Sequence, residues 1–451
     1  MNFYKLLQER AAKGQICRVG IIGMGKFASN MVSQLKGVPG IHLVGVADLS
    51  PTRAKTAFAR IGWEAERYAA TSLEEAMKKG STCILEDAME LIRSPFLEII
   101  VHATGSPEVT IPHVLACCEY KKHCLMVTVE TDALVGPYLV QKAKEAGIIY
   151  SMAYGDQPAE IYEMVDWAKT SGFEVVSAGK GTKYLPGYHQ STPETIWDYF
   201  GITPEVAARG GLNPKMYNSF LDGTKAAVEM VAVANACDLQ CDPAGLQFMP
   251  CGVDDLHSIL IPQSAGGLLP LHGQVECISS EEPDGRHVFR DLRYGVFVVY
   301  KANSEYQRNA FVEYKFLTDK SGEYTSMYRP NHLPGLETTI TIATMAIYGE
   351  STGEPCVFNG DVVATAKKDL AAGDMLDGEG GYAVYGKTQP ARNSLAINAL
   401  PLGLANNMKL IKPVKAGAPV TWDDVAVDED SVAIKMRKDM ERFYKNSFFG
   451  K

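Results

Sequence analysis

Three features are scarce in this sequence: long apolar runs, an excess of positive charge, and cysteines in a regular framework. No run of about 18 apolar residues occurs, the length that a membrane-spanning helix requires, so we expect no membrane partner. Lys and Arg number 44 against 53 Asp and Glu, a net charge of -9. This balance disfavours nucleic acid, whose phosphates require clustered cations, but leaves room for a local basic pocket that binds a phosphorylated metabolite.

The 10 cysteines are scattered along the chain. Cys237 and Cys241 have the spacing C-x3-C, but one such pair without two further ligands is a weak zinc motif, so we interpret both as buried free thiols. Residues 1–13 are charged and amphipathic and contain no apolar core of a signal peptide. Together these observations predict a protein of the reducing cytoplasm.

A chain of 451 residues is longer than a single hydrophobic core usually organises, so we expect two or three domains. Hydrophobic residues make up 46% of the chain and charged residues 22%, a composition typical of globular proteins. No low-complexity linker separates the parts, which predicts domains that pack together.

Residues 1–155 alternate between short apolar runs and helical patterns. The alternation is typical of a doubly wound parallel sheet, so an N-terminal Rossmann domain of the α/β class is predicted. The expected strands span residues 17–22, 42–47, 97–101, 124–129 and 148–151.

After residue 155 the pattern changes, and two further domains are predicted. Residues 156–355 indicate an α+β domain for substrate binding and dimerisation. Residues 356–451 contain a short internal repeat: residues 368–376 resemble residues 412–420, and each segment has a central glycine turn. This repeat indicates a small β-rich module. The strands expected in the middle domain span residues 173–178, 273–279, 296–300 and 310–316, and the helices 220–236 and 336–348.

A glycine-rich loop follows the first expected strand. It reads Gly23-x-Gly25-x-x-Ala28, with Lys26 and Phe27 at two variable positions, and a helical pattern begins at its end. The first glycine permits a tight turn, the second lets a pyrophosphate approach the backbone, and the alanine allows close helix packing. The helix N-terminus attracts phosphate charge. Strand, loop and helix together predict dinucleotide binding; a glycine turn in another α/β fold is the alternative.

The residues leave the choice between NAD and NADP open. Asp48 ends the second expected strand, where an acid binds the ribose 2′-hydroxyl and favours NAD. Ser50 and Arg53 follow closely and would hold a 2′-phosphate if the Asp48 side chain turned away. Thr104 and Gly105 end the third expected strand, where the backbone lines the cofactor in this fold.

Two segments carry candidates for proton transfer and anion binding, which hydride-transfer chemistry requires. Lys180 and Lys183 lie in residues 179–184, which we interpret as a glycine-flanked turn after a strand, with a solvated loop as the alternative. Asp222 and Lys225 precede a nearly apolar helix, so we expect them at the mouth of a cleft; a capped helix with a surface ion pair is the alternative.

Further polar residues are expected to face the ligand crevice. Carboxylates that follow the strands of a doubly wound sheet face that crevice, where they would orient substrate hydroxyls or hold a divalent cation. A single histidine is more often structural than functional, so His332 is a weaker candidate than the carboxylates. The candidates are Glu130 as a catalytic residue and Asp156, Gln157, Asn218 and His332 as substrate ligands.

Essentially the whole chain resembles a known family. It is similar to the 1-deoxy-D-xylulose 5-phosphate reductoisomerase-like proteins of some bacteria, which are distantly related to homoserine dehydrogenase and carry a C-terminal SAF-type domain. The most specific matching segments are residues 153–158, 179–184 and 376–382; residues 1–48, 213–229 and 361–387 also match.

The resemblance implies a reductoisomerase that rearranges a sugar phosphate and reduces the product with NADPH to 2-C-methyl-D-erythritol 4-phosphate, an isoprenoid precursor. Asp222 and Lys225 match the Asp and the proton-transferring Lys of homoserine dehydrogenases. Glu130 replaces another catalytic lysine of that enzyme, which argues against homoserine dehydrogenase activity itself. The helix expected at residues 336–348 would return to the Rossmann domain, and a homo-oligomer, dimer or tetramer, is implied by analogy.

Other functions stay open beside this one. Some relatives act on sugar acids in the reverse order, oxidising an alcohol with NAD and then rearranging the skeleton, and Asp48 suits that interpretation. A plain dehydrogenase of a sugar acid or an amino-acid precursor is a further alternative. The last is a non-enzymatic sensor of redox state, in which the C-terminal module binds a partner.

Overall fold

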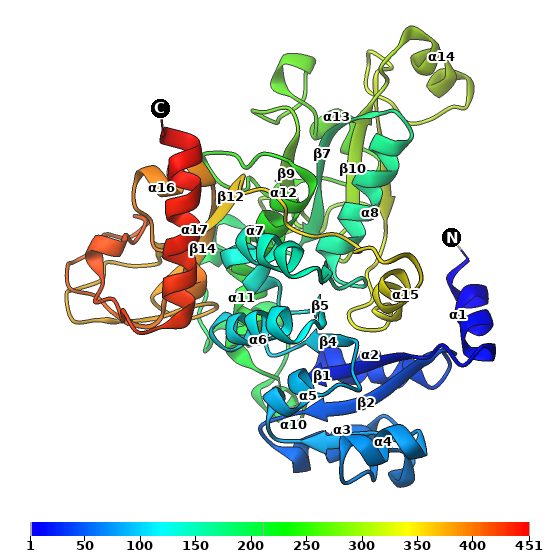
Figure 1. Cartoon of the computed structure of the whole chain (residues 1–451). Helices are drawn as coiled ribbons and strands as arrows, with labels where there is room; N and C mark the ends of the chain where they lie inside the picture. The colour runs from blue at the N-terminus through cyan, green and yellow to red at the C-terminus, as the bar shows by residue number, and fades with distance from the viewer. Residues whose placement is uncertain (1, 211, 451) are drawn as a thin grey trace. The chain divides into compact units, whose positions relative to one another are not determined.

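The computed structural model describes residues 2–210 and 212–450. The chain forms two compact units (Figure 1). Unit 1 comprises Met1–Glu160 and His332–Cys356, and unit 2 comprises Ile161–Asn331 and Val357–Lys451. The boundaries of the three domains expected from the sequence stay a prediction. Within the described part of the chain, no helix is both long and apolar enough to cross a membrane.

Unit 1 contains a six-stranded parallel sheet with the order β3-β2-β1-β4-β5-β6, which confirms the Rossmann-type fold. Its strands are buried on both faces, as the nearly continuous apolar run of the first strand shows. The expected strand at 17–22 is observed with the same bounds, whereas β3 was not predicted. The strands are β1 Cys17–Ile22, β2 Ile41–Ala47, β3 Cys83–Leu85, β4 Ile99–His102, β5 His123–Met126 and β6 Tyr150–Met152.

Helices cover this sheet, and one of them comes from the second segment of unit 1. That helix, α15, packs against α1 and α2. The expected strand at 124–129 is too long, because α7 begins at Val129 with Glu130 and Asp132 in its first turn, where acidic side chains stabilise a helix. The helices are α1 Phe3–Ala12, α2 Lys26–Leu35, α3 Pro51–Arg60, α4 Leu73–Lys79, α5 Ala88–Arg93, α6 Pro107–Tyr120, α7 Val129–Ala146 and α15 Thr339–Tyr348.

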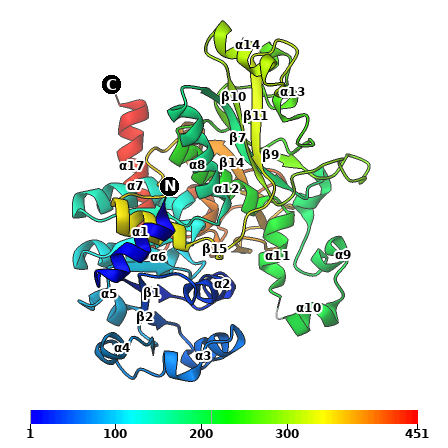
Figure 2. The same cartoon turned by 90° about the vertical axis from the view of Figure 1, so that its right-hand side faces the viewer.

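Unit 2 is built on a five-stranded mixed sheet with the order β11-β10-β7-β9-β8. Strand β10 runs antiparallel to both β7 and β11, and these three lie side by side (Figure 2). The long helix α12, Thr224–Cys237, is almost entirely buried. The strands are β7 Glu174–Thr182, β8 Met249–Pro250, β9 Gln274–Ser279, β10 Val296–Lys301 and β11 Tyr324–Arg329.

One expected strand of unit 2, at 310–316, is wrong. Helix α14 occupies most of that segment, because the Ser304 side chain caps its first turn by accepting the Gln307 N–H at 3.2 Å. Strand β11 was not predicted. The helices of this part are α9 Ile196–Phe200, α10 Pro204–Gly210, α11 Pro214–Leu221, α12 Thr224–Cys237, α13 Leu256–Ile259 and α14 Glu305–Glu313; α8 Gln157–Thr170 carries the boundary between the units.

The C-terminal segment of unit 2 is β-rich, as expected. The two segments of the internal repeat pair with each other: the Leu370 N–H donates to the Val414 carbonyl oxygen at 2.8 Å, and the Val414 N–H donates to the Leu370 carbonyl oxygen at 3.0 Å. The buried Arg437 of α17 forms ion pairs with Asp361 of β12 and with Glu441. The elements are β12 Gly360–Ala366, β13 Met375–Asp377, β14 Val384–Pro390, β15 Asn406–Lys409, α16 Ala391–Ala396 and α17 Val432–Phe449.

Candidate functional site

The glycine loop of unit 1 joins β1 to α2. Gly23 has a φ of 91°, and a Cβ there would lie 2.6 Å from the Ala103 carbonyl oxygen, so both the turn and the close approach require glycine. Gly25 is the N-cap of α2, and a Cβ there would meet nothing within 4 Å. Ala28 is buried against the sheet. The loop therefore leaves open space in front of a helix N-terminus, where backbone N–H groups bind phosphate.

Lys26 and Phe27 begin α2. The Lys26 side chain is exposed, whereas Phe27 is half-buried and packs at the edge of the Rossmann core. Their position in the first turn places both beside the open space at the N-cap. A pyrophosphate there would meet their backbone N–H groups.

The Asp48 carboxylate is turned inward, and its side chain is only 1% exposed. Its Oδ2 accepts the N–H of Met24 in the glycine loop at 2.9 Å. Its Oδ1 accepts the Ser50 N–H at 2.9 Å and the Arg53 Nη2 at 2.7 Å. Asp48 therefore braces the glycine loop against the loop after β2, while the Arg53 side chain stays 66% exposed beside it.

The loop after β4 carries the other residues predicted to line the cofactor. The Thr104 hydroxyl lies 2.9 Å from the Thr110 hydroxyl, and Gly105 N–H donates to Thr128 Oγ1 at 3.3 Å. Gly105 has a φ of 69°. These bonds fix the loop at the carboxyl end of the sheet, the edge at which parallel α/β sheets bind ligands.

The carboxylates that follow the strands lie at the starts of two different helices. Glu130 is half-buried in the first turn of α7. Its neighbour Asp132 accepts the Tyr150 hydroxyl at 2.6 Å within the core, so its oxygen serves the packing of β6. The Asp156 carboxylate accepts the backbone N–H of Gln157. Gln157 is a buried residue and begins α8. The half-buried His332 lies at the start of the returning segment.

Lys180 does not lie in a turn, contrary to expectation. It lies within β7, the central strand of the unit 2 sheet, and its buried ammonium pairs with Glu229 of α12. A Cβ on Gly179 or Gly181 would overlap a carbonyl oxygen of a neighbouring segment. The two glycines therefore permit close approach of the neighbouring backbone, and their presence around a lysine does not indicate a mobile loop.

Lys183 follows the same strand and is largely buried. Its ammonium donates to the Tyr199 carbonyl oxygen at 2.7 Å and lies 3.3 Å from Glu281 Oε1. The Tyr188 hydroxyl donates to the other Glu281 oxygen at 2.8 Å. Lys180 and Lys183 thus each face a carboxylate, and the folded chain presents neither as an unpaired cation for an anion.

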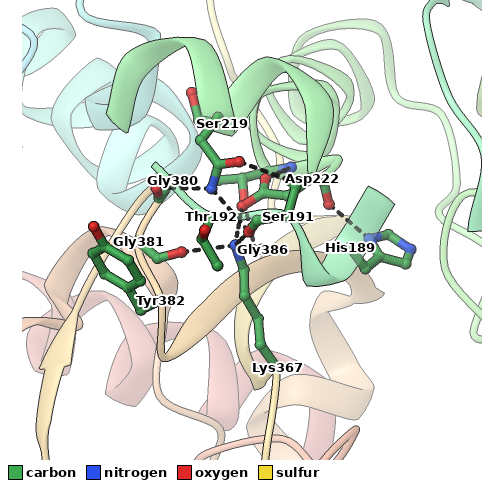
Figure 3. Close-up of polar contacts among 12 residues, drawn as sticks. His189, Ser191, Thr192, Ser219, Asp222, Lys367, Gly380, Gly381, Tyr382 and Gly386 are labelled. Carbon is green, nitrogen blue, oxygen red and sulfur yellow. Dashed lines mark hydrogen bonds and ion pairs between the residues drawn. The ribbon is translucent and has the colours of Figure 1, made fainter. Parts of the chain in front are cut away.

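Asp222 lies between α11 and α12 and is fully buried. Its Oδ2 accepts the ammonium of Lys367 at 2.7 Å, and its Oδ1 accepts the Thr224 N–H at 2.9 Å. Figure 3 shows Lys367 reaching from the C-terminal segment to this carboxylate. The same ammonium donates to the carbonyl oxygens of Ser191 and Gly381, each at 2.8 Å, so its three protons are all used.

Lys225 and Asn218 lie on the two helices that Asp222 separates. Lys225 is half-buried in the first turn of α12. The Asn218 amide group is fully buried: it accepts the Ser191 hydroxyl at 2.6 Å and donates to the Gly380 carbonyl oxygen at 2.9 Å. Asn218 therefore ties two loops together, which is a structural use of a residue predicted to bind substrate.

Sequence reasoning missed His189, which lies beside Asp222 (Figure 3). The backbone oxygen of Asp222 is an acceptor, so the His189 Nδ1, 2.6 Å away, carries the proton. Nε2 then accepts the Tyr184 hydroxyl at 2.8 Å. Burial lowers the pKa of His189, so the ring is neutral at physiological pH. Its partners are distant in the sequence, and no local motif marks it.

Glu276 on β9 is a second missed residue. It is fully buried and accepts the backbone N–H groups of Gln247 and Cys277, each at 2.9 Å. Burial raises the pKa of the Glu276 carboxyl to about 8, against the opposing effect of these N–H groups. The carboxyl is therefore largely protonated at neutral pH.

The cysteines of the C-x3-C pair are buried free thiols, as interpreted from the sequence. Burial raises the pKa of Cys237 and of Cys241 to about 12, so neither is a thiolate at neutral pH. Over the described ranges, the only group of three side chains arranged like metal ligands is buried in unit 1: His102, Cys117 and Cys124. It contains no predicted carboxylate, and a divalent cation on those carboxylates stays a prediction.

Two segments of the chain match family models of known proteins. Residues 155–338 match the family model described as oxidoreductase DRL, catalytic domain. Residues 361–426 match the model of the SAF domain, which confirms the C-terminal module expected from the resemblance. One segment of the chain is therefore similar to the oxidoreductase DRL catalytic domain, and a later segment is similar to the SAF domain. No curated protein matches the chain.

Solved structures of dehydrogenases resemble parts of the chain. The WlbA dehydrogenase from Bordetella pertussis, solved with NADH and UDP-GlcNAcA, is 14% identical with a TM-score of 0.28, over 39% of this chain and 46% of its own. An oxidoreductase from Agrobacterium radiobacter, solved with NAD+, L-tartaric acid and magnesium, is 16% identical with a TM-score of 0.26, over 37% and 44%. The matched part of this chain thus spans less than half the length of either protein.

Proposed function

We propose that the protein is an NAD(P)-dependent oxidoreductase that interconverts a hydroxyl and a carbonyl group on a small sugar-derived molecule. The observation that carries the proposal is the glycine loop. Gly23 closes on Ala103 at the carboxyl end of a parallel sheet, and Gly25 leaves open space at the N-terminus of α2. This is the cradle that a dinucleotide pyrophosphate occupies. The match to an oxidoreductase catalytic domain supports the redox chemistry.

Within this proposal we favour NADP over NAD. The Asp48 carboxylate, which would bind a ribose 2′-hydroxyl, is buried and already accepts three hydrogen bonds. The exposed Arg53 guanidinium lies beside it, and Ser50 begins the same helix, so a 2′-phosphate would meet a cation and a helix N-terminus.

The test of the cofactor is a fluorescence titration with NADPH and with NADH. Arg53→Ala should weaken NADPH binding by about tenfold, the effect of losing one charge-assisted hydrogen bond, and leave NADH binding unchanged. Lys55→Ala, which removes an exposed cation from the same helix, is the matched control. Tighter binding of NADH than of NADPH by the unaltered protein would reverse the assignment.

For the chemical step, Lys225 is the proposed proton-transfer residue, with Asp222 held in place by Lys367 as a positioning residue. Glu130, Asp156, Gln157 and His332 stay proposed ligands of substrate hydroxyls. Lys225→Met should abolish turnover with sugar acids and sugar phosphates and leave cofactor affinity intact, whereas the exposed control Lys320→Met should change neither. Near-normal turnover in Lys225→Met would remove its role.

The narrower reductoisomerase prediction rests on the sequence resemblance alone. The matched model describes an oxidoreductase and names no rearrangement, so a dehydrogenase of a sugar-derived substrate is the better supported activity. Product analysis by NMR separates the two activities, because a rearrangement changes carbon connectivity. A cytoplasmic location and a dimer or tetramer stay predictions from the sequence.

A further inference from the structure

Three side chains in unit 1 carry donor atoms of the kind that bind soft metal ions. They are His102 at the end of β4, Cys117 in α6 and Cys124 in β5. One donor atom from each, an imidazole nitrogen and two sulfurs, lies within 4.8 Å of the other two. All three side chains are fully buried. The oxidoreductase proposal assigns a role to none of them.

The β4–α6–β5 segment brings these residues together. In the register of the two strands, Ile100 lies opposite Cys124, and His102 follows two residues after Ile100. Because side chains alternate between the faces of a strand, His102 and Cys124 lie on the same face of the sheet. Helix α6 packs against β5, and its Cys117 Sγ lies 3.8 Å from His102 Nε2. Strand register and helix packing therefore create the cluster.

The histidine is the member of the cluster that packing alone does not explain. A free cysteine behaves as a small hydrophobic side chain in a core, whereas an imidazole ring has two nitrogens that require partners. The Nδ1 of His102 makes no hydrogen bond within the described part of the chain. Its Nε2 contacts the Cys117 sulfur at 3.8 Å, which is too long for a strong hydrogen bond. A fully buried ring held by no strong bond is unfavourable, so a further partner for the ring is expected.

The spacing of the donor atoms matches a metal site. Zinc binds a thiolate sulfur at about 2.3 Å and an imidazole nitrogen at about 2.0–2.1 Å. These bond lengths put the two atoms about 3.6 Å apart around a tetrahedral ion and about 3.8 Å apart around a trigonal one. The observed separation of His102 Nε2 and Cys117 Sγ is 3.8 Å. An ion between these two atoms would therefore require little movement of either side chain.

The charges of the three ligands suit a buried cation. Each thiol would release its proton to solvent as its sulfur–metal bond forms, and the imidazole would bind as the neutral ring. Two thiolates and one neutral ring around a divalent ion have no net charge. A neutral site avoids the large desolvation cost of an isolated charge in the core.

We propose that His102, Cys117 and Cys124 bind a structural, thiophilic metal ion, either Zn²⁺ or Cu⁺. Thiolate and imidazole ligands select these ions over Mg²⁺ and Ca²⁺, which prefer oxygen. The ion would fasten α6 to both strands below the loop that carries Gly105. That loop is joined to the site, because Thr128 Oγ1 accepts the Gly105 N–H and donates to the His102 carbonyl oxygen, each at 3.3 Å. The site goes beyond the oxidoreductase proposal and does not depend on a bound nicotinamide.

The test is metal titration of the full chain after it has been reduced and freed of metal with a chelator. Zn²⁺ is titrated in competition with a chromogenic chelator, and Cu⁺ is titrated in the same way without oxygen. One ion per chain should bind for at least one of the two metals, and the metal that binds more tightly identifies the ion. Co²⁺, a spectroscopic substitute for Zn²⁺, should give a thiolate-to-cobalt charge-transfer absorption.

Single substitutions locate the bound ion. Cys117→Ala and Cys124→Ala should each weaken binding by more than about a hundredfold, because losing a ligand costs more than losing one of its outer partners. Each should also reduce the thiolate-to-cobalt absorption by about half, since one of two thiolates is lost. Cys118→Ala is the matched control, because Cys118 follows Cys117 on α6 and lies outside the cluster. This variant should bind the ion as the unaltered chain does.

Melting temperatures separate metal binding from folding. Excess metal should raise the melting temperature of the unaltered chain and of Cys118→Ala, because only the folded state holds the three ligands together. His102→Leu provides a variant that keeps the site apolar and filled. It should fold without metal, since the ring it replaces makes no strong bond, and its melting temperature should not respond to metal.

Two results would overturn the metal site. One is the failure of both ions to bind the unaltered chain at micromolar concentration. The other is equal affinity in the unaltered chain, Cys117→Ala, Cys124→Ala and His102→Leu. Titrations of the metal-free chain with NADPH keep this result separate from the fate of the oxidoreductase proposal.

Discussion

The two units place their polar groups in different ways. In unit 1, the bonds around the glycine loop join residues that are near in sequence, such as Asp48 with Arg53, five positions apart, and with Met24, 24 apart. In unit 2, two buried ion pairs join residues far apart in the sequence: Lys367 and Asp222 are 145 positions apart, and Arg437 and Asp361 are 76 apart. Local bonds shape the glycine loop, whereas long-range buried pairs fasten distant segments of the fold together.

Arg437→Met tests the long-range side of this contrast and should have the largest effect. It leaves Asp361 and Glu441 buried without their cation, which costs about 3–5 kcal/mol of unfolding free energy. Arg442→Met, one turn away in an exposed pair with Asp439, should cost less than about 1 kcal/mol. Urea unfolding measures both, and equal losses would show that burial of the pair does not matter.

Glu276→Gln tests whether a buried acid of unit 2 makes the unfolding free energy depend on pH. Burial raises the folded-state pKa to about 8 from an ordinary value near 4.5, so the fold favours the protonated acid. The protonated Glu276 contributes its full stabilisation when the pH is below the ordinary pKa of the carboxyl. This contribution to the unfolding free energy is lost as pH rises toward 8, by up to about 1.4 kcal/mol per pH unit. The glutamine variant should flatten this decline between pH 5 and 8 (about the interval between the two pKa values). An unchanged slope would contradict the assignment.

Gly25→Val tests the local side and should have the smallest effect on stability. Its φ of −77° suits any residue and its Cβ would meet open space, so unfolding free energy should change by no more than about 1 kcal/mol. Cofactor affinity should fall by at least about tenfold, because the side chain fills the path of the pyrophosphate. Tight binding by this variant would place the dinucleotide elsewhere.

The same contrast explains what the sequence could reveal. Gly23, Gly25 and Asp48 were predictable because a strand, a turn and a helix end follow each other within one short segment. Lys180 was misplaced because glycines on both sides of a lysine look like a loop, whereas here they accommodate neighbouring backbone. Lys367 was missed because its partners, Asp222 and Ser191, come from segments that only the tertiary fold brings near.

Asp48 also has a kinetic consequence. A single buried carboxylate joins the glycine loop to the loop after β2, so the two parts of the proposed cofactor site are held together before a dinucleotide binds. Little ordering is then required on association, and the binding reaction should proceed in one fast phase with no slow loop closure behind it. Asp48→Asn should lower the association rate for either nicotinamide dinucleotide.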